Sequence, residues 1–456
     1  MPEHYATVNP CYHCMPLGAI FAAKGFEKTL TLLHGSQGCA TYMRRHLARH
    51  FHEPVDVVSS SLNEKDAIYG GEENLKKALR NTCKQYNLQM IIVASTCLSE
   101  TIGDDIGAVI KDVEKGVPGM AIPLVSVSTP SYQGSFSRGY WKTIKAALEK
   151  LSGKSSPCAQ EGDKGRVEKP FINIIPGLVT PQDLRWFLRL GELLGIDFHL
   201  LGNYANTFDA PWETSFKLMP EGGSPISYLR EAGAALATIE FSVVHPEADS
   251  PAVFLQQKFD VPAFRMPYPV GLDAVDKFMK VLTTFRGEKI PGEITENRGR
   301  LLDAMADAHK VLFAKKAVLF GESEYVFSVY RTLREWGMEC PALVYGERES
   351  LLKEEIKEKG ITFIDSGSMF ELKEWINCNE VDLLLGSSVG ASLSLEFGLP
   401  LLRRGFPIHD RFGAGRVLTV GYEGTLSLID DTANMFAAEI HASFRRKLKE
   451  SYLWKV

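Results

Sequence analysis

The chain has 456 residues, more than one ordinary hydrophobic core supports, so two or three domains are expected. Its residues are 45% hydrophobic and 23% charged, and its formal net charge is -5. This mild acidity argues against nucleic-acid binding, which normally requires a basic face. The sequence contains no run of about 20 apolar residues, so we predict no membrane-spanning helix. The first residues carry no basic stretch followed by an apolar core, so we expect no export signal and a cytoplasmic location.

Short apolar runs alternate with amphipathic stretches along the whole chain, which predicts βα units and parallel sheets. The elements predicted for the first block are strands Leu30–His34, Met90–Ser95 and Ile122–Val127, a helix through Tyr42, Leu47 and Phe51, and a helix from Ile102 through Val113. A polar stretch between Ser152 and Lys169, rich in Ser, Gly and Lys, is the predicted linker to the second block.

Two further blocks repeat the alternation of strand and helix. The second block contains the predicted strand Phe171–Ile175 and the predicted helix Pro181–Leu194. The third block contains the predicted strands Lys316–Phe320 and Val381–Leu385, with a helix from Tyr325 to Trp336. We therefore predict an α/β fold of three Rossmann-like domains, each a mainly parallel sheet flanked by helices, at residues 1–165, 166–295 and 296–456.

Five of the eight cysteines lie in the first hundred residues, and three of these share a predicted position in a turn. They are Cys14, Cys39 and Cys97, and the last two directly follow predicted strands, whose carboxyl ends converge on a ligand crevice. Thiolates beside glycines such as Gly18, Gly35 and Gly38 suit an iron–sulfur cluster, because small neighbours let backbone amides approach the sulfurs. Three thiolates leave such a cluster one ligand short, so a non-cysteine residue or another chain must complete it.

Two other roles for these cysteines stay open at this point, namely ordinary packing and zinc binding. A single cysteine in a large cytoplasmic protein is more often a small buried hydrophobic residue than a ligand. The pair Cys11-Tyr-His-Cys14 suggests zinc, but no second CxxC or HxxxH follows at zinc-finger spacing. Cys11 lies close enough in sequence to Cys14 to approach a cluster, yet we do not include it among the predicted ligands.

Several segments together are far more specific than any lone glycine motif, and they run nearly from end to end. These segments are Asn9-Pro10, Cys14-Met-Pro-Leu-Gly-Ala19, His34-Gly-Ser-Gln-Gly-Cys39, Arg49-His-Phe51, Glu53-Pro54, Ser95-Thr-Cys-Leu-Ser-Glu100, Ile102-Gly-Asp-Asp105, Thr129-Pro-Ser131, Gly405-Phe-Pro407, Asp410-Arg411 and Val420-Gly-Tyr-Glu-Gly424. In them the chain resembles the β-type subunit of the nitrogenase component 1 superfamily, either of a nitrogenase or of a nitrogenase-like reductase such as methylthio-alkane reductase.

The resemblance implies a metal site in this chain. Cys14, Cys39 and Cys97 match the β-side ligands of an 8Fe–7S P-cluster that is shared with a homologous α subunit. Ser131 matches a serine whose oxygen binds that cluster when it is oxidised, although a plain turn role is the alternative. No residue of this chain is expected to act as a catalytic acid or base.

The resemblance also implies a path for electrons. Tyr42 matches a tyrosine between the P-cluster and the active-site cofactor, and Tyr69 matches an aromatic residue on the surface where the iron protein docks. Ordinary packing is the alternative for both tyrosines. An ATP-dependent homodimeric iron protein with a 4Fe–4S cluster would deliver electrons one at a time, and the P-cluster would relay them to an iron–sulfur cofactor in the α subunit. By the same resemblance, two αβ pairs associate through their β subunits as α2β2.

Three departures from the β-subunit pattern keep alternatives open. Phe136-Ser-Arg-Gly139 replaces the usual His-Val-Thr-Gly, which favours a reductase of methylthio-alkane C–S bonds over a dinitrogen-reducing enzyme. His52 stands where Arg or Lys is commoner, so a metal between β subunits is not assigned to it. The segment Asp410–Arg416 looks more like the β-type subunit of the cofactor-assembly scaffold, a non-catalytic maturation protein. Scaffold chains generally lack the thiolate at Cys97, and its presence favours the catalytic complex.

Overall fold

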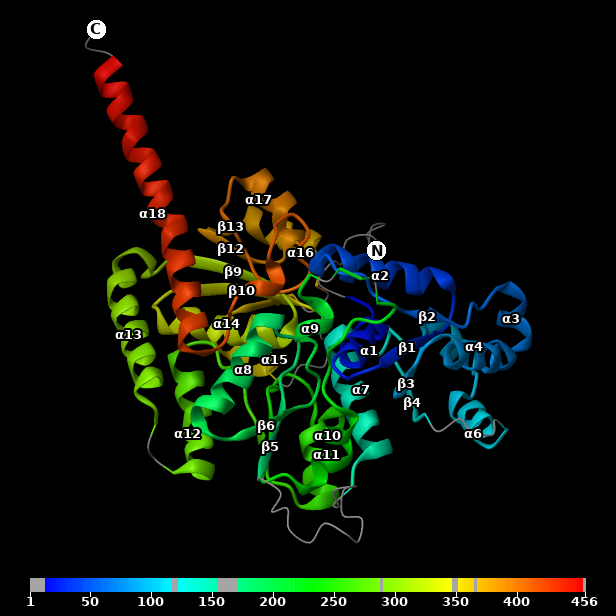
Figure 1. The fold of residues 1–456 in the computed structure, drawn as a ribbon. Helices are drawn as coiled ribbons and strands as arrows, with labels where there is room; N and C mark the ends of the chain where they lie inside the picture. The colour runs from blue at the N-terminus through cyan, green and yellow to red at the C-terminus, as the bar shows by residue number, and fades with distance from the viewer. Residues whose placement is uncertain are drawn as a thin grey trace.

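The computed structural model describes residues 13–453, apart from residues 117–121, 154–169, 213, 216, 288–289, 347–351 and 365–366. Three separate sheets with helices around them make up the molecule (Figure 1). Their strand orders are β2-β1-β3-β4, β6-β5-β7-β8 and β11-β10-β9-β12-β13. Every pairing between these strands is parallel, which confirms the predicted α/β fold class.

The first sheet and its helices carry the predicted cysteines. Its strands are β1 (Thr29–His34), β2 (Val58–Ser59), β3 (Met90–Ser95) and β4 (Leu124–Val127). The helices of this part are α1 (Met15–Lys24), α2 (Gln37–Phe51), α3 (Glu64–Tyr69), α4 (Glu72–Gln85), α5 (Cys97–Ile102), α6 (Ile106–Gly116) and α7 (Phe136–Leu151). The central strands β1 and β3 are buried along their whole length, and their last residues, His34 and Ser95, are register partners. The turns after both strands therefore lie side by side at one edge of the sheet.

The second and third sheets follow in chain order. The second part contains β5 (Phe171–Ile175), β6 (Asp197–Leu200), β7 (Thr238–Glu240) and β8 (Ala263–Arg265), with helices α8 (Pro181–Leu194), α9 (Ala205–Phe208), α10 (Ile226–Glu231), α11 (Pro251–Phe259) and α12 (Leu272–Arg286). The strands of the third part are β9 (Lys316–Gly321), β10 (Glu339–Tyr345), β11 (Thr362–Ile364), β12 (Leu383–Gly386) and β13 (Leu401–Arg403). Its helices are α13 (Gly292–Leu312), α14 (Ser323–Glu335), α15 (Lys353–Glu358), α16 (Met369–Asn377), α17 (Ala391–Phe397) and α18 (Gly421–Leu453).

One predicted helix was wrong. A single helix was expected from Ile102 through Val113, but α5 ends at Ile102 and α6 begins only at Ile106. Gly103 separates them in the left-handed conformation, with φ of 85°, a backbone shape that glycine adopts without strain. Hydrophobic periodicity did not reveal α5, because it has only six residues and one buried side chain, that of Ser99.

Helices α1 and α7 cross at a distance that only glycine permits. A Cβ atom at Gly18 of α1 would lie 1.8 Å from the Phe136 carbonyl oxygen. At Gly139 of α7, a Cβ would lie 2.1 Å from the Met15 carbonyl oxygen. All ten residues of α1 are buried, so this helix forms an internal layer of the first part of the chain. The close crossing fixes Cys14, which directly precedes α1, against the beginning of α7.

The three sheets share one continuous hydrophobic core. The same cluster of buried side chains includes Ile92 of the first sheet, Ile174 of the second and Leu319 of the third. Each sheet falls within one of the three predicted segments, but no break in the core marks a limit between them. The domain limits 1–165, 166–295 and 296–456 therefore stay a prediction.

The last helix extends beyond the rest of the chain. α18 runs beside α13 at its beginning, where Asn297 Nδ2 donates to Glu423 Oε1 at 2.7 Å, and its far half projects outward (Figure 1). Its 33 residues correspond to about 50 Å at the usual helical rise. On the projecting half, Ile440 and Phe444 are each 59% exposed. No helix in the described part of the chain is long and apolar enough to cross a membrane.

Candidate metal centre

The three predicted ligands occupy the beginnings of three helices. Cys14 is the N-cap residue of α1, Cys39 is the third residue of α2, and Cys97 is the first residue of α5. The prediction placed them in turns, so for Cys39 and Cys97 it missed the helix start by a few residues.

The structure brings these cysteines and Ser131 together at one edge of the first sheet. Burial raises the pKa of the Cys14 thiol, while a hydrogen bond with the Ser131 side chain opposes that rise. The nearby Cys97 and Cys39 thiols raise the pKa of Cys14 further, because neighbouring negative charges disfavour a thiolate. Cys14 and Cys39 are half-buried, Cys97 is exposed, and all three are free of disulfides. Four side chains from distant parts of the sequence thus meet at one partly open place.

Two of the sulfur atoms accept hydrogen bonds. The Ser131 backbone N–H donates to Cys97 Sγ at 3.2 Å, and Ser36 Oγ donates to Cys39 Sγ at 3.7 Å. Such contacts orient metal ligands and tune the potential of a cluster. No three His, Cys, Asp or Glu side chains in the described part of the chain are placed to hold a single metal ion. Cys11, the cysteine left open by the sequence, lies outside the described residues.

The expected role of the glycines was mostly wrong. Gly18 allows the crossing of α1 and α7, and a Cβ at Gly35 would lie 2.3 Å from Thr96 Oγ1. These two glycines therefore serve packing between helices and strand ends. Only Gly38 has open space, since its nearest neighbour would be Ser36 Oγ at 3.6 Å. Gly38 is the one residue of the three that leaves room beside a thiol.

Tyr42 lies on α2, one turn after Cys39, and is 46% exposed. Its ring contacts His46 at 4.4 Å between centroids, and His46 in turn contacts His13 at 5.2 Å. Burial raises the pKa of Tyr42, and nearby Cys14 adds to that rise, which indicates that the phenol lies close to this thiol. Burial lowers the pKa of His13 to about 3, so that ring is neutral. The sequence reasoning missed both histidines, although His13 directly precedes Cys14.

Tyr69 ends helix α3 and is 80% exposed. The loop after it is fixed to the first sheet by a buried pair, in which His34 Nε2 lies 2.9 Å from Asp104 Oδ2. The same carboxylate accepts the Gly71 N–H at 3.0 Å, and His34 Nδ1 lies 2.9 Å from Ser60 Oγ. This network was not predicted, although His34 and Asp104 both stand in segments that carry the resemblance. The exposed Tyr69 ring therefore sits on a braced surface.

The unusual segment after Gly134 holds parts of the chain together. Ser137 Oγ donates to Glu322 Oε1 at 2.6 Å and lies 2.9 Å from His245 Nε2, so one hydroxyl joins all three parts of the chain. Arg138 pairs with Asp249 at 2.6 Å. The preceding Phe136 is buried, with its ring 5.4 Å from that of His13 and 5.6 Å from that of Phe406. Packing between the parts accounts for these residue types.

His52 has a structural position in this chain. It follows α2 in the left-handed conformation, with φ of 60°, and its ring faces Phe412 at 5.5 Å. Burial raises the pKa of the neighbouring Glu53 carboxyl, which accepts a backbone hydrogen bond from Ala210. Neither contact identifies a metal.

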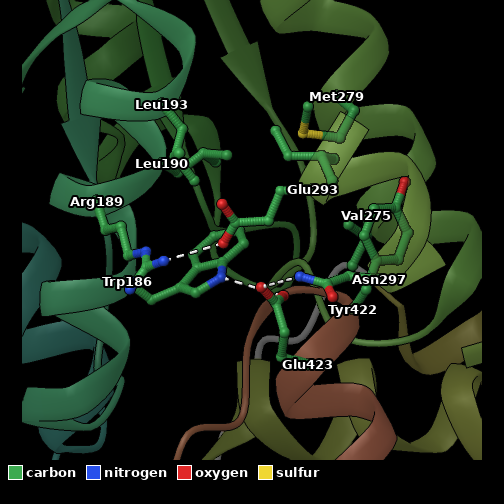
Figure 2. Close-up of a pocket in the computed structure, with 11 residues that line it drawn as sticks. Trp186, Arg189, Leu190, Leu193, Val275, Met279, Glu293, Asn297, Tyr422 and Glu423 are labelled. Atoms are coloured by element: carbon green, nitrogen blue, oxygen red, sulfur yellow. Dashed lines mark hydrogen bonds and ion pairs between the residues drawn. The ribbon is translucent and has the colours of Figure 1, made fainter. Parts of the chain in front are cut away.

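Two pockets lie outside the cysteine site. Figure 2 shows the first, between α8, α12, α13 and the start of α18, where polar side chains pair with one another beside the apolar side chains of Leu190, Leu193 and Met279. Arg189 bonds to Glu293 at 2.9 Å, and Glu423 accepts from both Trp186 at 3.4 Å and Asn297 at 2.7 Å. The second pocket lies between the three parts, and half of its lining residues carry aromatic rings, among them Phe21, Phe51, Phe136, Tyr325 and Phe406. None of the predicted site residues lines either pocket.

Comparisons with known proteins identify the family of the chain. The family described as nitrogenase component 1 type oxidoreductase matches residues 14–437. A nitrogenase molybdenum-iron protein beta chain from Clostridium pasteurianum is 34% identical, over 95% of this chain and 94% of that protein. The corresponding chain from Methanococcus maripaludis strain S2 is 32% identical, over 98% of both proteins. That of Azotobacter vinelandii is 33% identical, over 94% of this chain and 84% of the relative.

A solved structure supports the same family assignment. One chain of nitrogenase Cp1 at pH 6.5 superposes with a TM-score of 0.88 at 32% identity, covering 95% of this chain and 94% of that one. The chain therefore belongs to the nitrogenase component 1 family of oxidoreductases. Within that family it is a β-type subunit, and so a subunit of an oxidoreductase complex.

Proposed function

We propose that this chain relays electrons from an ATP-dependent iron protein, through an interface P-cluster, to a metallocofactor in a partner α subunit. The observation that carries the proposal is the meeting of the Cys14, Cys39 and Cys97 thiols with Ser131 at one partly open edge of the first sheet. A relay needs such a site near the surface, because electrons enter from one protein and leave to another. No acid or base of this chain takes part in the chemistry of the substrate.

The residues present fit an iron–sulfur cluster that another chain completes. Iron–sulfur clusters are held by thiolates, and here three free thiols stand together with one of them exposed. When bound, the cluster would supply one-electron storage at the interface, and we propose that it is the 8Fe–7S P-cluster. Cys14, Cys39 and Cys97 would hold it from this side, while the Ser131 N–H and Ser36 hydroxyl would stabilise charge on two of the sulfurs.

The positions of two tyrosines support the proposed partners. Tyr69 presents its ring on a braced surface, as a contact for the homodimeric iron protein with its 4Fe–4S cluster requires. Tyr42 lies near Cys14 and is half-exposed, so its ring is accessible to a homologous α subunit that carries the iron–sulfur cofactor. Two such αβ pairs would form an α2β2 heterotetramer in the cytoplasm.

Dinitrogen is the substrate that the comparisons favour, since the relatives at 32% to 34% identity are nitrogenase beta chains. The segment from Phe136 to Arg138 was the argument for methylthio-alkane C–S bonds. Its contacts with His245, Glu322 and Asp249 now account for it through packing within this chain. The substrate is bound by the partner subunit, so both substrates belong in the assay.

The test is to purify the chain anaerobically with its partner and count iron, molybdenum and vanadium in each αβ pair. An electron paramagnetic resonance spectrum identifies the cluster at the interface. A P-cluster together with a second large cofactor, and turnover that requires iron protein and ATP, would support the proposal. A four-iron interface cluster without turnover would indicate the assembly scaffold instead, despite Cys97.

A further inference from the structure

One carboxylate oxygen joins the ends of two strands to the helix that carries Cys97. Glu100 lies on α5, and its Oε1 accepts hydrogen bonds at 2.5 Å from Ser95 Oγ and at 2.5 Å from Ser128 Oγ. Ser95 is the last residue of β3, and Ser128 directly follows β4. Glu100 thus binds the two strand ends to the beginning of α5.

The turn after β4 continues from this clamp to the cysteines. Thr129 is fully buried, donates its backbone N–H to Ser95 Oγ at 2.8 Å, and donates its hydroxyl to the Ser95 carbonyl at 2.7 Å. Two residues further, the Ser131 backbone N–H donates to Cys97 Sγ at 3.2 Å. The Ser131 side chain also forms a hydrogen bond with the Cys14 thiol. One residue therefore touches two of the three thiols, and its place depends on the turn that Glu100 holds.

We infer that Glu100 is a positioning residue, which holds the turn 128–131 so that Ser131 stays between Cys97 and Cys14. The inference rests on the proposed function, because the place of Ser131 affects electron transfer only if those thiols hold a cluster. The Glu100 carboxylate accepts hydrogen bonds from Ser95 and Ser128, and it acts on the thiols through these two serines. Its role is to fix the hydrogen bonds that Ser131 makes to the thiols.

The first experiment measures hydrogen–deuterium exchange in the full chain with its partner, and it needs no bound cluster. In Glu100→Ala both serine hydroxyls lose their acceptor, so exchange of the Thr129 and Ser131 amides should become at least about tenfold faster. Glu100→Gln keeps an oxygen acceptor and should remain within about twofold of the wild type. Glu114→Ala removes an exposed contact with Lys150 on the same part of the chain and serves as the matched control. It should leave exchange of the Thr129 and Ser131 amides unchanged.

The second experiment is a double-mutant cycle on the potential of the interface cluster. Glu100→Ala should shift the potential by roughly 59 mV, equal to a tenfold change for a one-electron step. The shift should shrink in a Ser131→Ala background, because residues that act through one another are not additive. Equal shifts in both backgrounds, or unchanged exchange of the Thr129 and Ser131 amides, would overturn the positioning role.

The outcomes separate this inference from the proposed function. If the wild type holds no interface cluster, the proposed function fails, while faster exchange in Glu100→Ala still supports the positioning role. If the cluster is present and Glu100→Ala changes neither exchange nor potential, the proposed function stands and the inference is lost. Unchanged melting of the two Glu100 variants excludes general unfolding as the cause.

Discussion

Cys14 shows how individual side chains prepare the site. Its thiol is harder to ionise than a free thiol, because burial and two neighbouring thiols raise its pKa. The hydrogen bond with Ser131 lowers the pKa, but by less. A thiolate bound to iron has lost its proton, so assembly of the proposed cluster would release protons. The raised pKa makes that release more costly as the pH falls, and cluster loading should weaken in acid for this reason.

Tyr69 gives a test of docking at the same scale. Tyr69→Ala should raise the iron-protein concentration needed for half-maximal electron transfer about tenfold, because a lost aromatic contact at an interface costs about 1.4 kcal/mol or more. Iron content should not change, since the ring is 80% exposed and lies outside the cysteine site. Phe370→Ala, another exposed aromatic residue, is the control, on α16. Equal half-saturating concentrations for both variants and the wild type would remove Tyr69 from the docking surface.

The crossing of α1 and α7 is the feature of the fold that places Cys14. Gly18→Ala would put a Cβ 1.8 Å from the Phe136 carbonyl, so the helices would have to separate. Overpacking of this kind costs about 1–3 kcal/mol, and we expect urea unfolding at a correspondingly lower concentration. Gly299→Ala is the matched control in α13, because nothing lies within 4 Å of its Cβ, and it should be neutral or stabilising by about 0.5–1 kcal/mol. Equal stability of the two variants would contradict the close crossing.

Elements with long apolar patterns were predictable from the sequence, and short capped ones were not. The strand Phe171–Ile175 and the helix Pro181–Leu194 have the predicted limits, since burial of one face or of a whole strand leaves a clear period. Helix α5 has no such period, and its available signal was the capping box of Thr96 and Ser99. Cys97 was therefore predicted in a turn.

The contacts of the site join residues that are far apart in the sequence, so local sequence patterns could not predict them. The Glu100 oxygen meets Ser128 only because β3 and β4 are neighbours with a fixed register. The contact of Ser137 with Glu322 requires the first and third parts of the chain to pack together. The positions of Cys14, Cys39 and Cys97 in predicted turns already singled them out, Ser131 came only from the resemblance, and the supporting hydrogen bonds came only from the structure.

At the scale of the molecule, a buried carboxyl joins the second and third parts. Glu324 of α14 accepts hydrogen bonds from Ser242 Oγ at 2.7 Å and from the Val244 N–H at 2.8 Å. Burial, with a smaller effect of the nearby Glu322, raises its pKa from 4.5 to about 8. The folded chain thus holds this proton more tightly than the unfolded chain. The stability that this provides is complete below about pH 4.5 and is lost as the pH rises through about 8.

Glu324→Gln, which cannot titrate, should flatten this dependence. The urea midpoint of the wild type should fall between pH 5 and 8, and that of Glu324→Gln should fall less, because one group that takes up a proton on folding has been removed. Glu339→Gln, at an exposed position on β10, should keep the wild-type slope. Identical slopes for Glu324→Gln and the wild type would show that the buried carboxyl is charged throughout this range. Circular dichroism of the full chain follows the unfolding.

The central claim is that three thiols of this chain hold an interface cluster, and Cys97→Ala tests it most directly. Cys378→Ala is the control, because both cysteines are exposed and free but Cys378 lies at the end of α16. Iron content and the electron paramagnetic resonance spectrum are measured on each complex after anaerobic purification. We predict that Cys97→Ala loses the P-cluster signal and iron-protein-dependent turnover with an unchanged melting temperature, while Cys378→Ala keeps all three. A complete cluster and normal turnover in Cys97→Ala would contradict the claim.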